Sequence, residues 1–243
     1  MTNYENADTL EESIKSIVSQ FGLEDEIIVV DNLSSKEARS ILEQLHSKFN
    51  IRVIPKKSSR GMGKQIALEA ATGDYVVDQL DTDDVYKPIF SQILQFYHEK
   101  YEGKLMLMHG FMVSLRKLLL ELGGWPDIQC SEDRALWCKA AQVNKLVYVD
   151  FKVRSKIKGN VENRPLMKKI RRRYEWSRDY RLLGLNPWAG IARRPSLVLY
   201  YPVSLIGVLA SFFHKPVGIS LKSFEYERFE GEKFAPAEEL PKN

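Results

Sequence analysis

Hydrophobic and polar positions follow two alternating periods over roughly the first 150 residues. Continuous apolar runs of strand length suit strands that are covered on both faces, whereas apolar residues every three or four positions mark one face of a helix. The pattern predicts strands at 26–31, 51–54 and 75–80, and helices that start near residues 8 and 34 and span 63–71 and 88–101. Strands that alternate with helices predict an α/β fold with a mostly parallel sheet flanked by helices.

A cluster of carboxylates follows the third predicted strand. Asp81, Asp83 and Asp84 lie within four residues, so solvent, a neighbouring base or a bound metal must offset their mutual repulsion. A divalent cation that bridges to a diphosphate accounts for the cluster, and a solvated acidic turn is the alternative. Because ligands of such sheets bind beyond the carboxyl ends of the strands, where Asp31-Asn32 also falls, the two strand ends predict a nucleotide site.

The glycine-rich segment Gly61-Met62-Gly63-Lys64 matches neither common nucleotide motif. A P-loop requires a glycine where Ser58 stands, and the dinucleotide fingerprint lacks its third glycine at Ile66. The segment is therefore interpreted as a turn that enters a helix, where Lys64 or Arg60 can approach a phosphate, or as a plain loop.

A second acidic pair follows Gly123-Gly124-Trp125. Ser131 can cap a helix that carries Glu132 and Asp133 in its first turn. A carboxylate in this position can act as a catalytic base, or it can simply offset the helix dipole.

Composition indicates one catalytic-size domain with an appendage. The chain has 243 residues, 44% of them hydrophobic, and a net charge of +4, which excludes a disordered protein. Cys130 and Cys138 have neither zinc-site nor disulfide-framework spacing, so a reducing compartment is expected. The first residues lack the pattern of a signal peptide, and the catalytic part is therefore expected in the cytoplasm.

Basic and apolar segments follow residue 150. Between Arg164 and Arg181 eight Lys or Arg residues stand against Glu175 and Asp179, which indicates an anionic partner, a membrane surface or merely a solvated face. The uncharged stretch from Pro195 to Phe213 would span about 28 Å as a helix, enough to cross a bilayer or to lie in its interface. A buried helix is the alternative. We expect attachment to the cytoplasmic face of the cell membrane.

In their order and spacing, these segments resemble the nucleotide-sugar glycosyltransferases with a GT-A fold, in particular the inverting family 2. The matching segments are Thr2–Asn6 with Leu10–Ile14, Ile28–Asn32, Gly61–Asp74, Asp81–Asp84, and Gly123-Gly124 leading to Glu132-Asp133. The resemblance covers about residues 1–150 and implies a Rossmann-like catalytic domain there. A basic and aromatic helical region (151–194), a hydrophobic membrane-associated segment (195–214) and a C-terminal tail (215–243) are expected to follow.

The resemblance also implies roles for the donor side of the site. Asp31 would contact the base or ribose of a UDP- or GDP-sugar, and Asp81 would support the nucleotide. Asp83, with Asp81, would ligate the Mg²⁺ or Mn²⁺ that bridges the diphosphate. The remaining donor contacts would come from Tyr4, Asn32 and Lys64.

On the acceptor side, the resemblance implies that Asp133 is the catalytic base. It would remove the proton from an acceptor hydroxyl as that oxygen attacks the anomeric carbon with inversion, while Glu132 would help to position the acceptor. This pair favours a hydroxyl on a lipid-linked sugar or a polysaccharide, because the phosphate acceptor of a polyprenyl- or dolichyl-phosphate sugar synthase, the enzymatic alternative, is already ionised.

The family usually has a buried strand ahead of the segment matched by Thr2–Asn6, and the sequence provides no room for it. Either the natural start lies upstream, or neighbouring strands are left with unpaired backbone groups. A degenerate nucleotide-sugar or nucleic-acid binding protein is therefore the non-enzymatic alternative. Nucleic acid is not expected as a partner, because the carboxylates of residues 81–84 would repel a polyanion.

Overall fold

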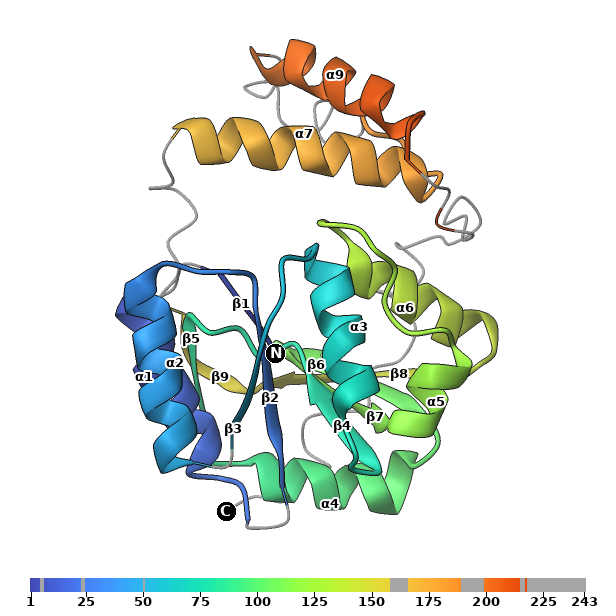
Figure 1. Ribbon diagram of the computed structural model, residues 1–243. Coiled ribbons are helices and arrows are strands. Elements are labelled where there is room, and N and C mark those ends of the chain that lie inside the picture. The colour runs from blue at the N-terminus through green and yellow to red at the C-terminus, as the bar shows by residue number, and fades with distance from the viewer. Residues whose placement is uncertain are drawn as a thin grey trace.

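The computed structural model describes residues 1–4, 7–22, 25–49, 51–157, 166–188, 199–214 and 217 (Figure 1). Its first sheet is wholly parallel and has the order β1-β2-β3, with β1 at Thr2–Asn3, β2 at Ile27–Asp31 and β3 at Ile51–Pro55. All five residues of β2 are buried, as its continuous apolar run predicts for a central strand covered on both faces. The strands of this sheet confirm the expected alternation of strands and helices.

The second sheet is mixed, which differs from the expected mostly parallel arrangement. It has the order β4-β7-β6-β8, and only β6 and β8 are parallel neighbours; the strands are β4 (Tyr75–Asp78), β6 (Leu105–His109), β7 (Phe111–Leu115) and β8 (Leu146–Lys152). Gly110, at φ +75°, is the single residue between β6 and β7, and so tight a turn permits only antiparallel neighbours. Strands β5 (Asp84–Tyr86) and β9 (Arg154–Ile157) form a separate antiparallel pair.

Helices flank the two sheets (Figure 1). They are α1 (Ala7–Val18), α2 (Lys36–Lys48), α3 (Arg60–Ala70), α4 (Phe90–Tyr101), α5 (Arg116–Glu121) and α6 (Glu132–Gln142). Ser35 caps α2 through the Ala38 amide, close to the predicted start near residue 34. Helix α3 begins three residues before the predicted start, because Ser59 accepts a hydrogen bond from the Met62 amide and extends the helix through both glycines.

The start of the chain forms a short strand between the two sheets. β1 contributes two residues, and the Met1 amino group donates to the Ile28 carbonyl at 2.8 Å, where the ladder with β2 continues. Beyond it lies a cavity of about 360 Å³ between β2 and β4, lined among others by Ile28, Val77 and Lys64. Hydrogen bonding across the described strands therefore does not join the two sheets into one.

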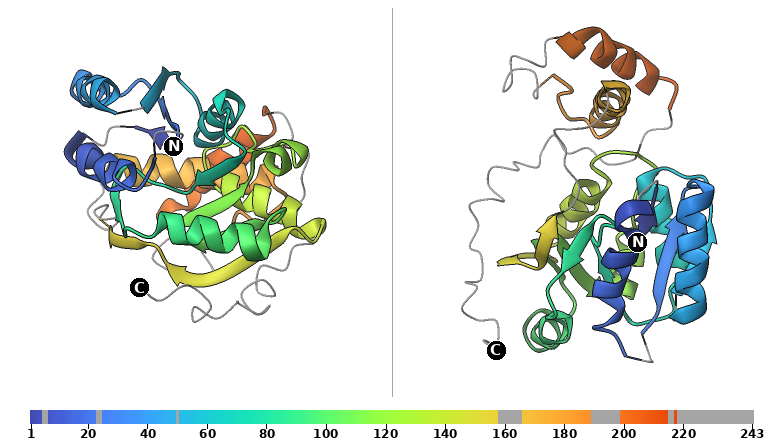
Figure 2. Two further views of the ribbon diagram at one scale, coloured as in Figure 1. Left: turned by 90° about the horizontal axis from the view of Figure 1, so that it is seen from below. Right: turned by 90° about the vertical axis from the view of Figure 1, so that its left-hand side faces the viewer.

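Two helices lie together at one end of the molecule, across the carboxyl ends of the first sheet (Figures 1 and 2). They are α7 (Leu166–Leu182) and α9 (Tyr201–Ser211). The predicted helix over the stretch from Pro195 to Phe213 is shorter than expected, since α9 has 11 residues. Among the described residues, none of the helices combines the length and apolar composition needed to cross a membrane. Residues 195–198 of the predicted hydrophobic segment, and all of the predicted tail (215–243) except residue 217, lie outside the described residues.

Candidate active site

A cleft of about 550 Å³ lies between α7 and the carboxyl ends of β1 and β2. Its walls bring together the end of the first sheet, the start of α3, the aspartate loop after β4, the start of α6 and one side of α7. The residues that were predicted for the site and that line the cleft are Tyr4, Asn32, Asp81, Asp83 and Glu132. Segments far apart in the sequence thus meet where the α/β fold places a ligand.

Helix α1 fixes the backbone of the aspartate loop. Ser13 Oγ donates to the Asp81 carbonyl at 3.0 Å, and Thr9 Oγ1 donates to the Thr82 carbonyl at 2.9 Å. On the other side, the Asp81 amide donates to the Tyr86 hydroxyl at 2.6 Å. These bonds leave the Asp81 carboxylate free to project from a fixed main chain.

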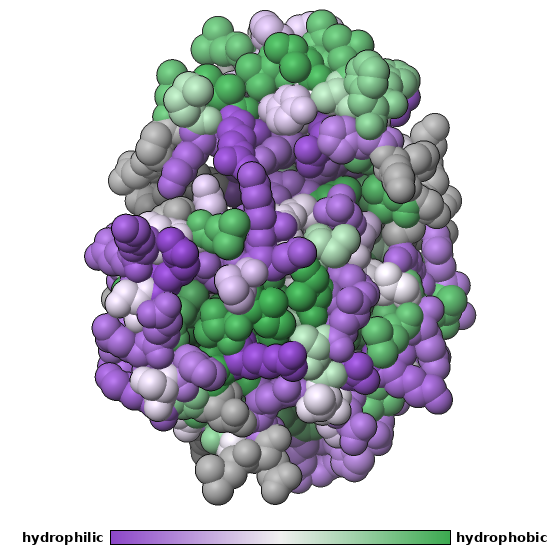
Figure 3. All heavy atoms as spheres, in the orientation of Figure 1, coloured by the Kyte–Doolittle hydropathy of each residue, from purple (hydrophilic) through white to green (hydrophobic). Residues whose placement is uncertain are grey.

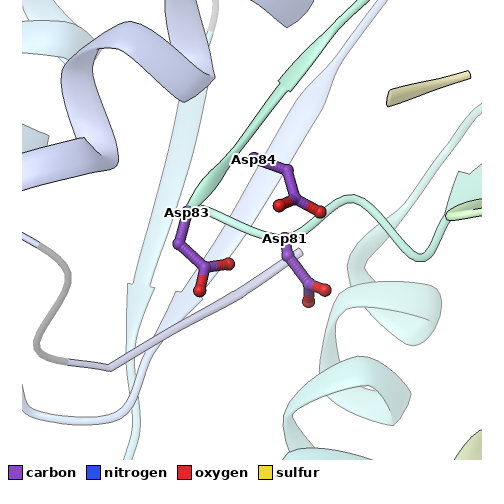
Figure 4. A group of neighbouring side chains, drawn as sticks. All are labelled: Asp81, Asp83 and Asp84. Atoms are coloured by element: carbon purple, nitrogen blue, oxygen red, sulfur yellow. The ribbon is translucent and has the colours of Figure 1, made fainter. Parts of the chain in front are cut away.

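Three carboxylates converge at this loop (Figure 4). Oxygen atoms of Asp81, Asp83 and Asp84 all lie within 4.8 Å of one another. Asp84 is 2% exposed, and burial, with added repulsion from Asp81 and Asp83, raises the pKa of its carboxyl group to about 6. An all-oxygen set of this kind fits a hard divalent cation such as Mg²⁺ or Mn²⁺.

Arg154 lies closer to Asp84 than to Asp81, a pairing that the sequence pattern did not indicate. Its guanidinium lies 2.7 Å from Asp84 Oδ2 and 3.6 Å from Asp81 Oδ2. Gly110 makes room for it, because a Cβ atom there would lie 1.7 Å from Arg154 Nε. Since Asp84 already has a close cationic partner, Asp81 and Asp83 are the carboxylates best placed for a metal.

Asp31 lies beneath the cleft and is 1% exposed. Its Oδ1 accepts hydrogen bonds from Asn3 Nδ2 at 2.9 Å and Ser34 Oγ at 2.6 Å, and its Oδ2 accepts from the Ser34 amide. Asn3 also accepts from Thr82 Oγ1, so this network ties the end of the first sheet to the aspartate loop. The structure therefore gives Asp31 a supporting position, and the neighbouring Asn32 forms the cleft wall.

Lys64 was expected to approach a phosphate, but the structure directs it to carboxylates. It is 8% exposed, and its Nζ lies 2.9 Å from Asp78 Oδ2 and 2.7 Å from Asp133 Oδ1. These negative neighbours raise the pKa of the Lys64 ammonium despite its burial, so Lys64 stays charged. Arg60, one turn earlier on α3, is the residue of this helix that lines the cleft.

The two acidic residues at the start of α6 have different surroundings: Glu132 lines the cleft, and Asp133 contacts the buried Lys64. Glu132 lines the cleft and is 3% exposed; its burial and the neighbouring Asp133 raise the pKa of its carboxyl group to about 7. Asp133 Oδ1 accepts from Trp125 Nε1 at 2.8 Å and from Lys64, and neither bond uses Oδ2. Ser131 precedes the helix as predicted, but at φ 64° its side chain makes no capping hydrogen bond.

Gly61 allows α3 to approach the acidic pair. A Cβ atom at this position would lie 1.9 Å from the Pro126 carbonyl oxygen and 3.1 Å from Glu132 Cβ, and the Gly61 amide donates to the Ile128 carbonyl. The glycine of the Gly61–Lys64 segment thus permits a close helix contact that places Lys64 beside Asp133.

Helix α7 supplies positive charge to the opposite wall. Lys168, Arg171 and Arg172 line the cleft together with Trp176. The sequence predicted a basic helix but did not select residues from it. The structure places Lys168, Arg171 and Arg172 at the cleft, with Arg171 also paired with Glu175, whereas Arg173 Nε donates to Ser204 Oγ and Arg178 pairs with Asp179 away from it.

The cleft has acidic residues at a strand end and cations opposite, at the edge of the sheet where α/β folds bind ligands. Residues 1–113 match the family model described as glycosyl transferase family 2. Over these residues, which make up somewhat less than half of the chain, the protein is similar to this family of transferases, and its fold is GT-A-like. The matched range includes the aspartate cluster and ends before Glu132 and Asp133.

One curated relative and several solved structures are similar to the chain as well. Over 91 residues the chain is 34% identical to an uncharacterized glycosyltransferase of Nostoc sp., an alignment that covers 36% of this chain and only 28% of the relative. Among solved structures, it resembles a mannosyltransferase from Pyrobaculum calidifontis in complex with GDP-mannose and Mn²⁺, with a TM-score of 0.59, 17% identity, and 95% and 77% of the two chains covered. For residues 1–349 of TarS from S. aureus, the TM-score is 0.55 at 18% identity, and 63% and 57% are covered.

Proposed function

We propose that the chain transfers a sugar from a UDP- or GDP-sugar to a hydroxyl acceptor, with inversion and with a divalent cation. The carrying observation is the cleft itself, in which Asp81 and Asp83 face the cationic side of α7 and Glu132 closes one end. The similar fold of proteins solved with GDP-mannose and Mn²⁺, UDP-GlcNAc or UDP supports a nucleotide-sugar donor.

On the donor side, Asp83 and Asp81 would hold Mg²⁺ or Mn²⁺, which neutralises the diphosphate as it leaves. Arg60 and the α7 cations Arg171 and Arg172 would bind phosphate oxygens, in place of the predicted contact from Lys64. Asn32 and Tyr4 would contact the nucleoside, while Asp31 fixes the strand end beneath them.

On the acceptor side, Asp133 would accept the proton of the attacking hydroxyl on Oδ2, since Trp125 and Lys64 hold Oδ1 and orient the carboxylate. Glu132, in the cleft wall, would position the acceptor. The acceptor would be a lipid-linked sugar or a polysaccharide at the cytoplasmic face of the cell membrane. A base of this kind favours a hydroxyl over the ionised phosphate of a polyprenyl-phosphate.

The test is hydrolysis of a panel of UDP- and GDP-sugars by the purified protein with Mn²⁺ or with EDTA. We expect release of nucleotide from one donor, loss with EDTA, and a fall of at least about 100-fold in Asp83→Ala and in Asp133→Asn. Asp150→Ala is the matched control, because this carboxylate is exposed and pairs with His109 on β6.

Three outcomes would contradict the proposal. Hydrolysis that is unchanged by EDTA and by Asp83→Ala would show that the reaction does not depend on a metal at Asp83. Full activity of Asp133→Asn with inactive Glu132→Gln would assign the base to Glu132. Donor binding without turnover, or salt-sensitive binding of an oligonucleotide that ignores Asp83→Ala, would support a binding protein instead.

A further inference from the structure

The polar and apolar faces of α9 are reversed relative to those of a surface helix in a soluble domain. Its buried residues are Ser204, Gly207 and Ser211, which face α7. Its large apolar side chains are exposed and form, with their neighbours, an apolar face made up of Leu199, Tyr201, Leu205, Ile206, Leu209, Phe212 and Phe213. A helix that packs on a protein and meets water on its other side normally shows the opposite distribution.

Contacts with α7 hold α9 in this orientation. Arg173 Nε donates to Ser204 Oγ at 2.7 Å, and both side chains are buried. At Gly207, a Cβ atom would lie 2.5 Å from the Tyr174 carbonyl oxygen, so no larger residue fits against α7 there. Rotation of α9 to bury its leucines would break the hydrogen bond and bring bulky side chains against the α7 backbone. The packing of α9 against α7 therefore fixes the apolar face of α9 outward.

The exposed charge beside this face is positive. Lys169 is exposed on α7 and does not line the cleft, and Arg181 of the same helix contacts Phe212, whereas Glu175 is paired with Arg171 and Asp179 is fully buried. Figure 3 shows apolar side chains gathered at the α9 end of the molecule, above a band of hydrophilic residues. At the boundary between the two, the Arg181 guanidinium lies 3.7 Å from the centre of the Phe212 ring.

We propose that α9 docks in the interface of an anionic lipid bilayer, with its apolar face among the acyl chains and the basic residues outside the cleft, Lys169 and Arg181, at the headgroups. A second copy of the chain fits less well, because a symmetric contact through α9 would bring two basic α7 helices together. Since α7 also forms a wall of the cleft, docking would set the cleft mouth close to the headgroups. The consequence that the acceptor is membrane-borne rests on the proposed function, whereas the docking does not.

Co-sedimentation with vesicles tests the docking in the absence of any donor. We expect the protein to bind vesicles of phosphatidylcholine mixed with phosphatidylglycerol, and to bind phosphatidylcholine alone more weakly. In the double variant Ile206→Glu and Leu209→Glu, the partition coefficient should fall at least about tenfold. Val143→Glu is the matched control, since Val143 on the α6–β8 loop is 54% exposed, against 59% for Ile206 and 54% for Leu209.

Two further measurements separate the possible results. Hydrogen exchange should show that vesicles protect the amides of α9, which detects docking without any substitution. Donor hydrolysis without vesicles should be the same in the double variant and in the wild-type protein, so a failure of the proposed function would leave the docking result unaffected. Wild-type protein that ignores vesicles would overturn the proposal, as would a dimer that the double variant converts to monomers.

Discussion

At the scale of single residues, the carboxylates of the cleft differ in how far the protein already neutralises them. Asp84 is paired with Arg154, and Asp133 is held by Lys64 and Trp125. Glu132 lies further from its cations, 3.9 Å from Arg60 and 3.7 Å from Lys64, and next to Asp133. Because it is also buried, its ionised form is disfavoured, so the charge of Glu132, like that of Asp84, responds to pH near neutrality.

This environment predicts a pH-dependent effect of Glu132→Gln on stability. The pKa of the Glu132 carboxyl group is raised from 4.5 to about 7, so its contribution to stability is complete below about pH 4.5 and is lost as the pH rises through 7. Glutamine cannot ionise. The free energy of unfolding of the variant should therefore gain on that of the wild-type protein by about 2 kcal/mol between pH 5 and pH 8.

Urea denaturation of both proteins at several pH values measures this difference. Glu43→Gln, at an exposed position on α2, serves as the control for the exchange of glutamate for glutamine. A constant difference for Glu132→Gln would show that Glu132 ionises normally in the folded protein.

At the scale of elements, the packing of α3 against the segment before α6 depends on Gly61. Alanine normally stabilises the interior of a helix relative to glycine by about 1 kcal/mol. At Gly61 the added Cβ atom would overlap the Pro126 carbonyl oxygen, so one of the two segments must move. Gly61→Ala should instead destabilise the protein by about 2 kcal/mol and reduce turnover, because Lys64 is drawn away from Asp133.

Thermal unfolding and donor hydrolysis check this expectation together. Gly73→Ala is the control, because the nearest atom to its added Cβ would be the Tyr75 carbonyl oxygen at an ordinary 3.7 Å. A Gly61→Ala protein that is more stable and fully active would mean that the two segments do not need their close contact.

Sequence patterns predicted those elements whose signal is local. The buried run of β2, the Ser35 cap of α2 and the approximate positions of β3, β4 and α4 are examples. The β6–β7 hairpin was missed, because both strands are continuous apolar runs separated by a single glycine and show no alternation. The length of α9 was overestimated for a related reason, since apolar content alone does not show where a helix begins.

The candidate site was predictable only in part, for a physical reason. The cluster of Asp81, Asp83 and Asp84 is contiguous, so its mutual repulsion can be inferred from the chain alone. The partnership of Arg154 with Asp84 joins residues 70 positions apart and depends on the β5–β9 ladder. The same holds for Lys64, whose carboxylate partners Asp78 and Asp133 come from two other elements.

At the scale of the whole molecule, the described strands form two sheets with a cavity between them, and the cleft lies across both. One wall comes from the ends of β1 and β2, and the other from the loop that follows β4. A hydrogen bond from Thr82 to Asn3 links them directly, and Ser13 of α1 donates to the Asp81 carbonyl. A nucleoside diphosphate with its cation would therefore contact both halves at once.

Such a ligand should stiffen the molecule as well as occupy it. We expect UDP or GDP with Mn²⁺ to slow amide hydrogen exchange in β2 and β4 together, and to raise the melting temperature, because binding to the folded state alone adds to stability. In Asp83→Ala the same nucleotide and metal should leave the exchange of β4 unchanged. Protection confined to β2 would indicate that the nucleotide contacts only one half.

Under the proposed function, the donor would therefore also stabilise the fold. A nucleotide and its metal bound in the cleft would link the two sheets by contacting both. A protein of this design would be loosest when it has no donor, and each round of nucleotide release would return it to that looser state. Turnover and resistance to proteolysis should then both rise over the same range of donor concentration.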